Sequence, residues 1–145
     1  MEEAAGAEAG LRCGCGASTK QEFDAAIHEA VAAAVADLGM PGAVGAQPPI
    51  ADLAVVFVSA AYGPAIRPVM EHLADLVPAR RLLGSTAEGI LAGDREYEAG
   101  PAVAVWLARL PASRLETFSL EYTQTADGGM FAGWPETTAE AWPAN

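Results

Sequence analysis

The stretch LLGSTAEGILAGDREYEAGPAVAVWLARL, residues 82–110, decides the fold expected for this chain of 145 residues. It opens with two leucines, continues into a small polar segment at 84–89, and closes with an apolar run at 102–110 that only Arg109 interrupts. This pattern is typical of buried strands joined by an exposed loop, and a loop held on a rigid scaffold is a common place for a binding site. No catalytic signature occurs in the stretch, so it indicates a fold class but not a reaction.

The other apolar segments complete an α/β domain, in which a mixed sheet is layered with helices. Residues 51–59, ADLAVVFVS, form the clearest strand, and both of its faces are expected to be covered because polar residues do not alternate with the apolar ones. The predicted strands are 51–59, 82–84, 89–91, 102–110 and 114–123, with a weak edge strand at 11–16, and the predicted helices are 20–38 and 64–77.

The first predicted helix has recognisable start and stop signals. Thr19 and Glu22 have the spacing of a capping box, so the helix is expected to begin at Lys20. An apolar stripe at helical spacing follows, and Gly39 suits the position just after the last turn. His28 lies at the edge of the stripe, where a half-exposed helix histidine is favoured over a metal or haem ligand.

Charge and cysteine content restrict the possible partners. The chain carries 19 acidic and 8 basic residues, a net charge of −11, and its only basic pair is Arg80-Arg81. Such a surface repels phosphate backbones and anionic lipid, so neither a nucleic-acid partner nor a membrane partner is predicted. The first ten residues have no features of a targeting peptide, and a cytoplasmic location is expected. Cys13 and Cys15 are predicted to be free thiols, with a soft metal at this C-x-C pair as the alternative.

The central stretch also carries a family resemblance. The pattern G-S-T-A-E-G-I-L-A-G-x-R-E-Y-E-x-x-P-A-V-A-V at 84–105, followed by L-P at 110–111, resembles the N-terminal part of the FIST domain (F-box and intracellular signal transduction). The strand at 51–59 matches the first core strand of that family at the correct spacing, and the resemblance covers roughly residues 16–122. The family often has G-C-S where this chain has Gly84-Ser85-Thr86, so any thiol role at that position is absent here.

The resemblance implies a non-enzymatic sensory domain for signal transduction that binds a small polar ligand, possibly an amino acid. The alternative is a protein-interaction platform that recruits substrates to an F-box-type ubiquitin ligase, and an enzyme is the least supported possibility. Because FIST proteins continue into a C-terminal half, the expected organisation is a disordered or weakly structured segment at 1–15, a FIST N-like domain at 16–125, and an irregular tail at 126–145. Phe131, Trp134 and Trp142 in that tail are expected to be poorly buried without the missing half.

A ligand site is predicted around the glycine-flanked loop. Its glycines allow close approach to the backbone, its hydroxyls add hydrogen-bonding groups, and its carboxylates suit a cationic group such as an ammonium. The predicted ligand-binding residues are Gly84, Ser85, Thr86, Glu88, Gly89 and Glu96. In the competing interpretation the glycines only permit a tight turn and Glu96 only stabilises the turn before the next strand.

Enzymatic chemistry finds little support in the same segment. Glu88 with Glu96 or Glu98 is a conceivable acid/base pair, but no His, Cys or Lys stands beside these carboxylates in the sequence. Ser85 lacks the G-x-S-x-G context of a nucleophile elbow, and the loop has neither a Walker lysine nor G-x-G-x-x-G spacing. Accordingly no catalytic residue, metal ligand or cofactor is predicted.

Overall fold

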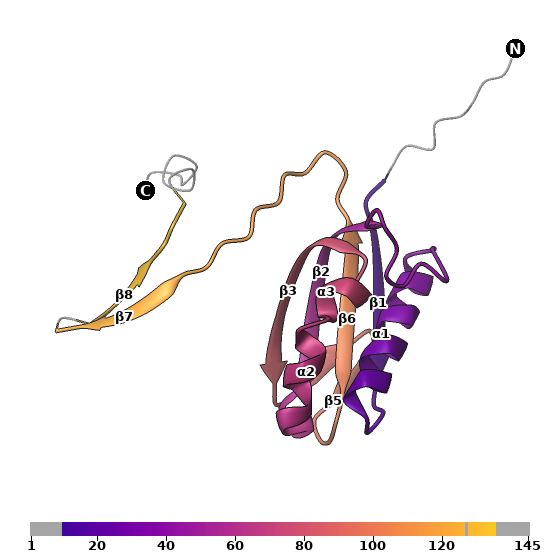
Figure 1. Ribbon diagram of the computed structural model, residues 1–145, viewed down its shortest axis with the longest axis horizontal. Coiled ribbons are helices and arrows are strands. Elements are labelled where there is room, and N and C mark those ends of the chain that lie inside the picture. The colour runs from indigo at the N-terminus through magenta and orange to yellow at the C-terminus, as the bar shows by residue number, and fades with distance from the viewer. Residues whose placement is uncertain (1–9, 127, 136–145) are drawn as a thin grey trace, which may run out of the picture. The chain divides into compact units, whose positions relative to one another are not determined.

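The computed structural model describes residues 10–126 and 128–135, which form two separate compact units that divide between Leu115 and Glu116. The centre of the first unit is a mixed four-stranded sheet in the order β1-β6-β2-β3. β2 runs parallel to β3 and antiparallel to β6, while β1 runs antiparallel to β6 (Figure 1). The strands of this sheet are β1 (Arg12–Ser18), β2 (Ala51–Ser59), β3 (Ala79–Ala87) and β6 (Val103–Arg109). The predicted α/β class is therefore confirmed.

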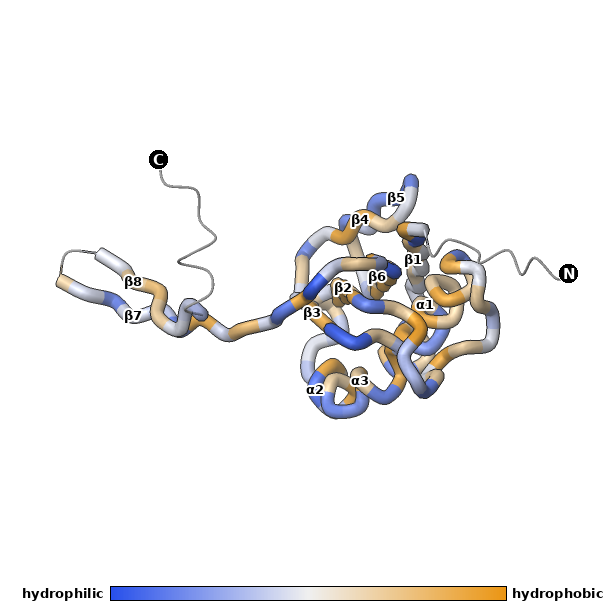
Figure 2. The backbone as a smooth tube through the Cα atoms, turned by 90° about the horizontal axis from the view of Figure 1, so that it is seen from above, coloured by the Kyte–Doolittle hydropathy of each residue, from blue (hydrophilic) through white to orange (hydrophobic). Residues whose placement is uncertain are grey.

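One face of this sheet is covered by helices, as Figures 1 and 2 show. The helices are α1 (Phe23–Asp37), the 3-10 helix η1 (Ala60–Ala65), α2 (Ile66–Met70) and α3 (Leu73–Leu76). The main hydrophobic core joins buried side chains of α1 and α3 to alternate residues of β2 and β6. Each fully buried Val, Ile or Leu contributes about 1.5–3 kcal/mol, so this layer supplies most of the stability of the unit.

α1 buries the predicted apolar stripe, but it starts three residues later than predicted. It begins at Phe23, and Glu22 occupies the N-cap position without a side-chain capping bond, so the capping-box prediction is wrong. The preceding segment is held instead by the Ser18 hydroxyl, which accepts a hydrogen bond from the Lys20 amide at 3.3 Å. The C-terminal end is as predicted, because Gly39 has φ of 87° and ends the helix in a left-handed turn.

The second predicted helix, 64–77, is broken into η1, α2 and α3 in the structure. Gly63 lies within η1 at φ 53° and ψ −132°, where the helical path is interrupted. Pro68 lacks the amide donor that a continuous helix would direct to the carbonyl oxygen of Pro64. His72 then separates α2 from α3 with φ −109° and ψ 2°. The non-helical conformations of Gly63 and His72 therefore divide the apolar pattern among short helices in place of one long helix.

The opposite face of the sheet is only partly covered, so the prediction that β2 is covered on both faces is wrong. A short hairpin of β4 (Ile90–Ala92) and β5 (Arg95–Tyr97) packs there, and Figure 2 shows it on the side of the sheet away from α2 and α3. Ile90 joins Ala102 and Ala104 in a small second core. Beyond the hairpin this face is open, and the Phe57 side chain on β2 is 41% exposed.

The second unit is an antiparallel hairpin of β7 (Glu121–Thr125) and β8 (Gly128–Ala132). Only the last part of the predicted strand 114–123 is a strand, and the sequence pattern did not indicate β8. Phe131 and Trp134 are 55% and 53% exposed, as predicted, whereas Trp142 lies outside the described residues. Tyr122 packs on Phe131 across the hairpin with ring centroids 5.2 Å apart. An isolated two-stranded hairpin of this kind has marginal stability in water.

Candidate functional site

The segment predicted as a ligand-binding loop is largely a β-strand. β3 runs from Ala79 to Ala87, so the predicted end of the strand at residue 84 is wrong, and only Glu88 and Gly89 lie in the bend before β4. The register pairs Gly84 with Val56 and Thr86 with Val58. Because strand side chains alternate, these residues belong to the helix-covered face, whereas Ser85 belongs to the opposite face. Because β2 continues as a parallel partner up to Ser59, β3 extends through the polar residues to Ala87.

A cavity of about 290 Å³ lies between this part of β3 and α2. Its wall is mainly aliphatic, with a hydroxyl and a glycine backbone from β3. The lining residues are Val56, Val58, Ile66, Met70, Gly84, Ser85 and Thr86. A Cβ atom at Gly84 would lie 2.9 Å from the Val56 carbonyl oxygen, so glycine allows the two strands to pair closely at the cavity. A small molecule with an apolar group and a hydrogen-bonding group is the kind of ligand that such a wall accommodates.

The structure brings together only some of the predicted site residues. Gly84, Ser85 and Thr86 line this cavity, whereas Glu88, Gly89 and Glu96 are not among its lining residues. Glu96 lies on β5 opposite Leu91 and is exposed. Sequence reasoning missed the contribution of α2, because the proximity of Ile66 and Met70 to β3 depends on how the helix packs and not on sequence spacing.

A second concave surface lies on the open face of the sheet. The strand register places Cys15 beside Trp106, Trp106 beside Val55, and Val55 beside Leu83. This row of four residues is apolar except for the thiol. Together with the β4–β5 hairpin it borders a cavity of about 380 Å³, lined by Cys15, Val55, Phe57, Leu91, Ala92, Gly93, Ala104, Val105 and Trp106. Leu83 is 50% exposed and Leu91 is 73% exposed, which leaves an extended apolar surface facing solvent.

The two cysteines are free thiols in the structure, as predicted. They lie two residues apart on β1, so both side chains point to the open face of the sheet. Within residues 10–126 and 128–135, no group of three or more His, Cys, Asp or Glu side chains is arranged to hold a metal ion.

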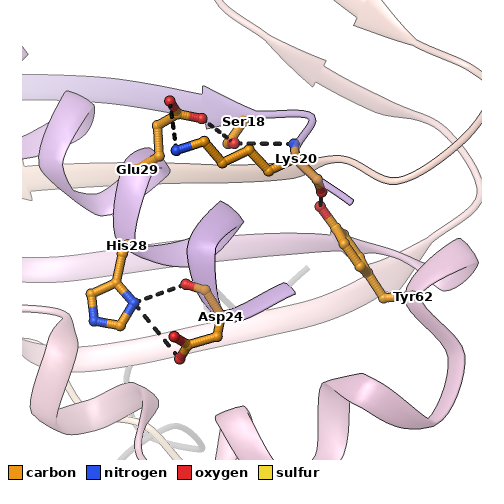
Figure 3. Close-up of polar contacts among 6 residues, drawn as sticks. All are labelled: Ser18, Lys20, Asp24, His28, Glu29 and Tyr62. Carbon is orange, nitrogen blue, oxygen red and sulfur yellow. Dashed lines mark hydrogen bonds and ion pairs between the residues drawn. The ribbon is translucent and has the colours of Figure 1, made fainter. Parts of the chain in front are cut away.

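A polar cluster fixes the start of α1 to the sheet and to η1 (Figure 3). Glu29 accepts a hydrogen bond from the Ser18 hydroxyl and lies 3.3 Å from the Lys20 Nζ. These two contacts hold the pKa of Glu29 below its ordinary value, and the hydrogen bond from Ser18 has the larger effect. The Tyr62 hydroxyl donates to the Lys20 carbonyl at 2.7 Å, and burial raises the pKa of Tyr62.

His28 occupies the half-exposed helical position that the sequence favoured. Its Nδ1 donates to the Asp24 carbonyl oxygen at 2.8 Å, one helical turn earlier, and lies 3.7 Å from the Asp24 carboxylate (Figure 3). Both contacts are local to α1, so His28 has a structural environment typical of a surface helix residue.

The fold is that of a small α/β domain with a concave surface on each face of its sheet. None of the helices within the described ranges has the length and hydrophobicity needed to span a bilayer. The sequence model of the FIST N domain matches residues 52–137, which is more than half of the chain. The chain therefore belongs to the FIST N domain family, a family of signal-transduction sensory domains. The resemblance seen in residues 84–105 is thereby confirmed.

Similar proteins have been found in mycobacteria. The uncharacterized protein Rv0628c of Mycobacterium tuberculosis is 35% identical over 124 residues, a match that covers 86% of this chain and 30% of the relative. The uncharacterized protein Mb0898c of Mycobacterium bovis is 32% identical over 124 residues, with the same coverage. The chain thus spans less than a third of the length of these relatives.

Proposed function

We propose that this chain is a ligand-sensing domain and that the cavity between β3 and α2 binds a small amphipathic molecule such as an amino acid with an apolar side chain. The observation that carries the proposal is the position of Gly84, Ser85 and Thr86, the predicted binding residues, on the wall of that cavity. Its volume of about 290 Å³ is near the lower end of the range for ligand pockets. A ligand of amino-acid size therefore suits it better than a large cofactor.

The chemistry of the lining defines two ends for such a ligand. Val58, Ile66 and Met70 provide an aliphatic surface for its side chain. Thr86 adds a hydroxyl, which donates or accepts one hydrogen bond without much bulk. Glu88 follows β3 directly and is exposed, so an ammonium group that extends beyond the cavity would find a carboxylate nearby.

The proposal is tested by titrating the ¹⁵N-labelled chain with individual amino acids. Saturable shifts are expected at the amides of residues 84–86 and of α2. Thr86→Val removes the hydroxyl and keeps the shape, so it is expected to weaken binding about five-fold, which corresponds to one neutral hydrogen bond of about 1 kcal/mol. Thr123→Val on the separate hairpin is the matched control. Shifts confined to residues outside β3 and α2 would refute the site.

The predicted role of Glu96 is tested by a second pair of variants. Weaker binding in Ser85→Ala and Glu96→Gln would support the sequence-based site, but the Ser85 side chain lies on the face opposite the cavity and Glu96 lies on β5. Both variants are therefore expected to bind the ligand as the wild type does and to keep its melting temperature, since both side chains are exposed. If both variants lose several degrees of melting temperature and bind the ligand normally, these residues stabilise the strand and the turn instead.

A second candidate function, a platform for protein interaction, is favoured by the open apolar face of the sheet. Phe57, Leu83 and Leu91 are each more than 40% exposed on or beside that face. Extended exposed apolar surfaces of monomers usually mark contact sites. The partner that we propose is the C-terminal half of a longer FIST protein, because the match covers only 30% of the length of each mycobacterial relative. Recruitment of substrates to a ubiquitin ligase stays a prediction.

The interaction candidate is tested by mixing this chain with the non-matching part of Rv0628c and following association by ultracentrifugation. Leu83→Lys is expected to abolish association, because a buried ammonium opposite an apolar surface is costly. Ala99→Lys, in the exposed segment after β5, is the matched control. Association should also slow the alkylation of Cys15, which lines the cavity on the open face. Association that is unaffected by Leu83→Lys would exclude this face.

A further inference from the structure

The sheet gathers basic residues at one of its ends. β1 begins with Arg12, β6 ends with Arg109, and the register places these two opposite each other. β2 and β3 start at the same end, because Leu53 pairs with both Ala108 and Arg81. Four of the eight basic residues of the chain, which are Arg12, Arg80, Arg81 and Arg109, therefore share one end of a protein whose net charge is −11.

A cavity of about 450 Å³ opens at this basic end and is the largest of the three described. It is lined by Asp52, Arg80, Arg81, Ser113 and Leu115. Two guanidinium groups and one hydroxyl can donate hydrogen bonds into this space. Its volume lies within the range of small-molecule sites.

Asp52 organises the cavity through both of its carboxylate oxygens. Oδ2 accepts a hydrogen bond from the Leu110 amide at 2.8 Å, which fixes the chain just after β6. Oδ1 lies 3.5 Å from Nε of Arg80, which orients that guanidinium at the start of β3. The negative charge of Asp52 is thus shared between an amide and Arg80, so it opposes an incoming anion less than a free carboxylate would.

Arg81 supplies the second positive charge. Its Nη1 donates to the Arg80 carbonyl oxygen at 3.2 Å, and among the described residues no carboxylate lies within ion-pairing distance of it. The charges of Asp52, Arg80 and Arg81 sum to +1 around the cavity. The guanidinium of Arg81 is therefore available to an external anion.

We propose that Arg80, Arg81 and Ser113 form a binding site for a small phosphate-bearing anion, separate from the cavity beside α2. The planar fork of a guanidinium matches the oxygens of phosphate and binds them in a bidentate manner. A second guanidinium and a hydroxyl suit a compact group with two negative charges better than a monocarboxylate. A long nucleic acid is disfavoured, because the remaining surface of this acidic chain repels a phosphate backbone.

The site is tested by titrating the labelled chain with inorganic phosphate at constant ionic strength and following the Nε resonances of the arginines. Saturable shifts of Arg80 and Arg81 are expected. Arg81→Gln is expected to weaken phosphate binding at least about ten-fold, the effect of losing one charge-assisted contact. Arg95→Gln, an exposed arginine on β5, is the matched control and should leave the affinity unchanged.

Parallel titrations with sulfate, citrate and chloride define the anion. Binding of phosphate and sulfate in preference to citrate supports a tetrahedral oxyanion site, whereas equal or tighter binding of citrate overturns the assignment to phosphate. Shifts that rise linearly with every anion, chloride included, would show non-specific screening and overturn the site. If Arg95→Gln weakens phosphate binding as much as Arg81→Gln does, the proposed site is also overturned.

Discussion

Gly16 on β1 lies directly against the main-chain carbonyl oxygen of Ala30 on α1, with no room for even a methyl group between them. Gly14, two residues earlier on the same face, is equally close to the backbone of Leu38. The helix therefore packs on β1 through its backbone. This close contact explains why the glycine-rich segment at the N-terminal end of the domain is a full edge strand and not a weak one.

Gly16→Ala is expected to destabilise the protein by about 1–3 kcal/mol or more, because the added methyl group meets backbone atoms that cannot move aside. Denaturant unfolding checks this value. Gly89→Ala is the matched control, since a Cβ there would meet nothing closer than the Tyr97 carbonyl oxygen at 4.0 Å. Equal stability of the two variants would contradict the packing described for β1 and α1.

Tyr62→Phe is expected to cost about 1 kcal/mol of unfolding free energy, because it removes the hydrogen bond to the Lys20 carbonyl and keeps the packing of the ring on Phe23. Burial raises the pKa of Tyr62. The contribution of Tyr62 to stability is therefore fully present below the unfolded pKa of 10.0 and is lost as the pH rises through the folded pKa. Denaturant unfolding between pH 8 and about 11 should show a smaller alkaline loss in Tyr62→Phe. Parallel alkaline profiles would contradict the burial of this phenol.

Glu29→Gln is expected to reduce the sensitivity of stability to acid. The pKa of Glu29 is lowered by the Ser18 hydroxyl and then by Lys20, so its contribution is present above the unfolded value of 4.5 and is lost as the pH falls through the folded pKa. Thermal unfolding across the acid range should therefore give a flatter profile for this variant. Glu98→Gln, an exposed residue in the segment after β5, is the control and should keep the wild-type slope.

Trp134 is expected to show red-shifted fluorescence in this chain, because its side chain is 53% exposed and contacts Phe118 with ring centroids 5.8 Å apart. The double variant Trp106→Phe and Trp142→Phe isolates its signal. The emission should shift to the blue when a C-terminal FIST half is supplied and covers the aromatic residues. An emission that is already blue in the isolated chain, and that stays so, would contradict this prediction.

Local features of the sequence were enough to predict several elements. The bounds of β2 agree with the predicted strand 51–59, and the buried side of α1 agrees with the predicted stripe. In both cases the signal is periodic apolar composition over neighbouring residues, which reflects burial directly. The family was also recognisable, because its motif is a continuous stretch of residues 84–105.

Residues 84–87 form a strand because they pair with β2, which lies beside them in the sheet. These small polar residues favour a loop by local preference, but β2 offers a continuous parallel partner that extends β3 to Ala87. Strand propensity depends on packing and pairing more than on the isolated residue, so the tertiary context prevailed. The same pairing put Gly84 and Thr86 on the face towards α2.

By itself, the sequence determined the α/β class, the family, the main strand and the apolar side of the first helix, because each of these depends on residues that are close along the chain. Only the tertiary structure decided which face of the sheet is left open, which residues line each cavity, and that Arg12, Arg81 and Arg109 share one end of the sheet. The physical reason is strand order. The strand order β1-β6-β2-β3 brings together residues that are separated by most of the chain. Their alignment is fixed by the hydrogen-bonded register between the strands, which no local sequence pattern predicts.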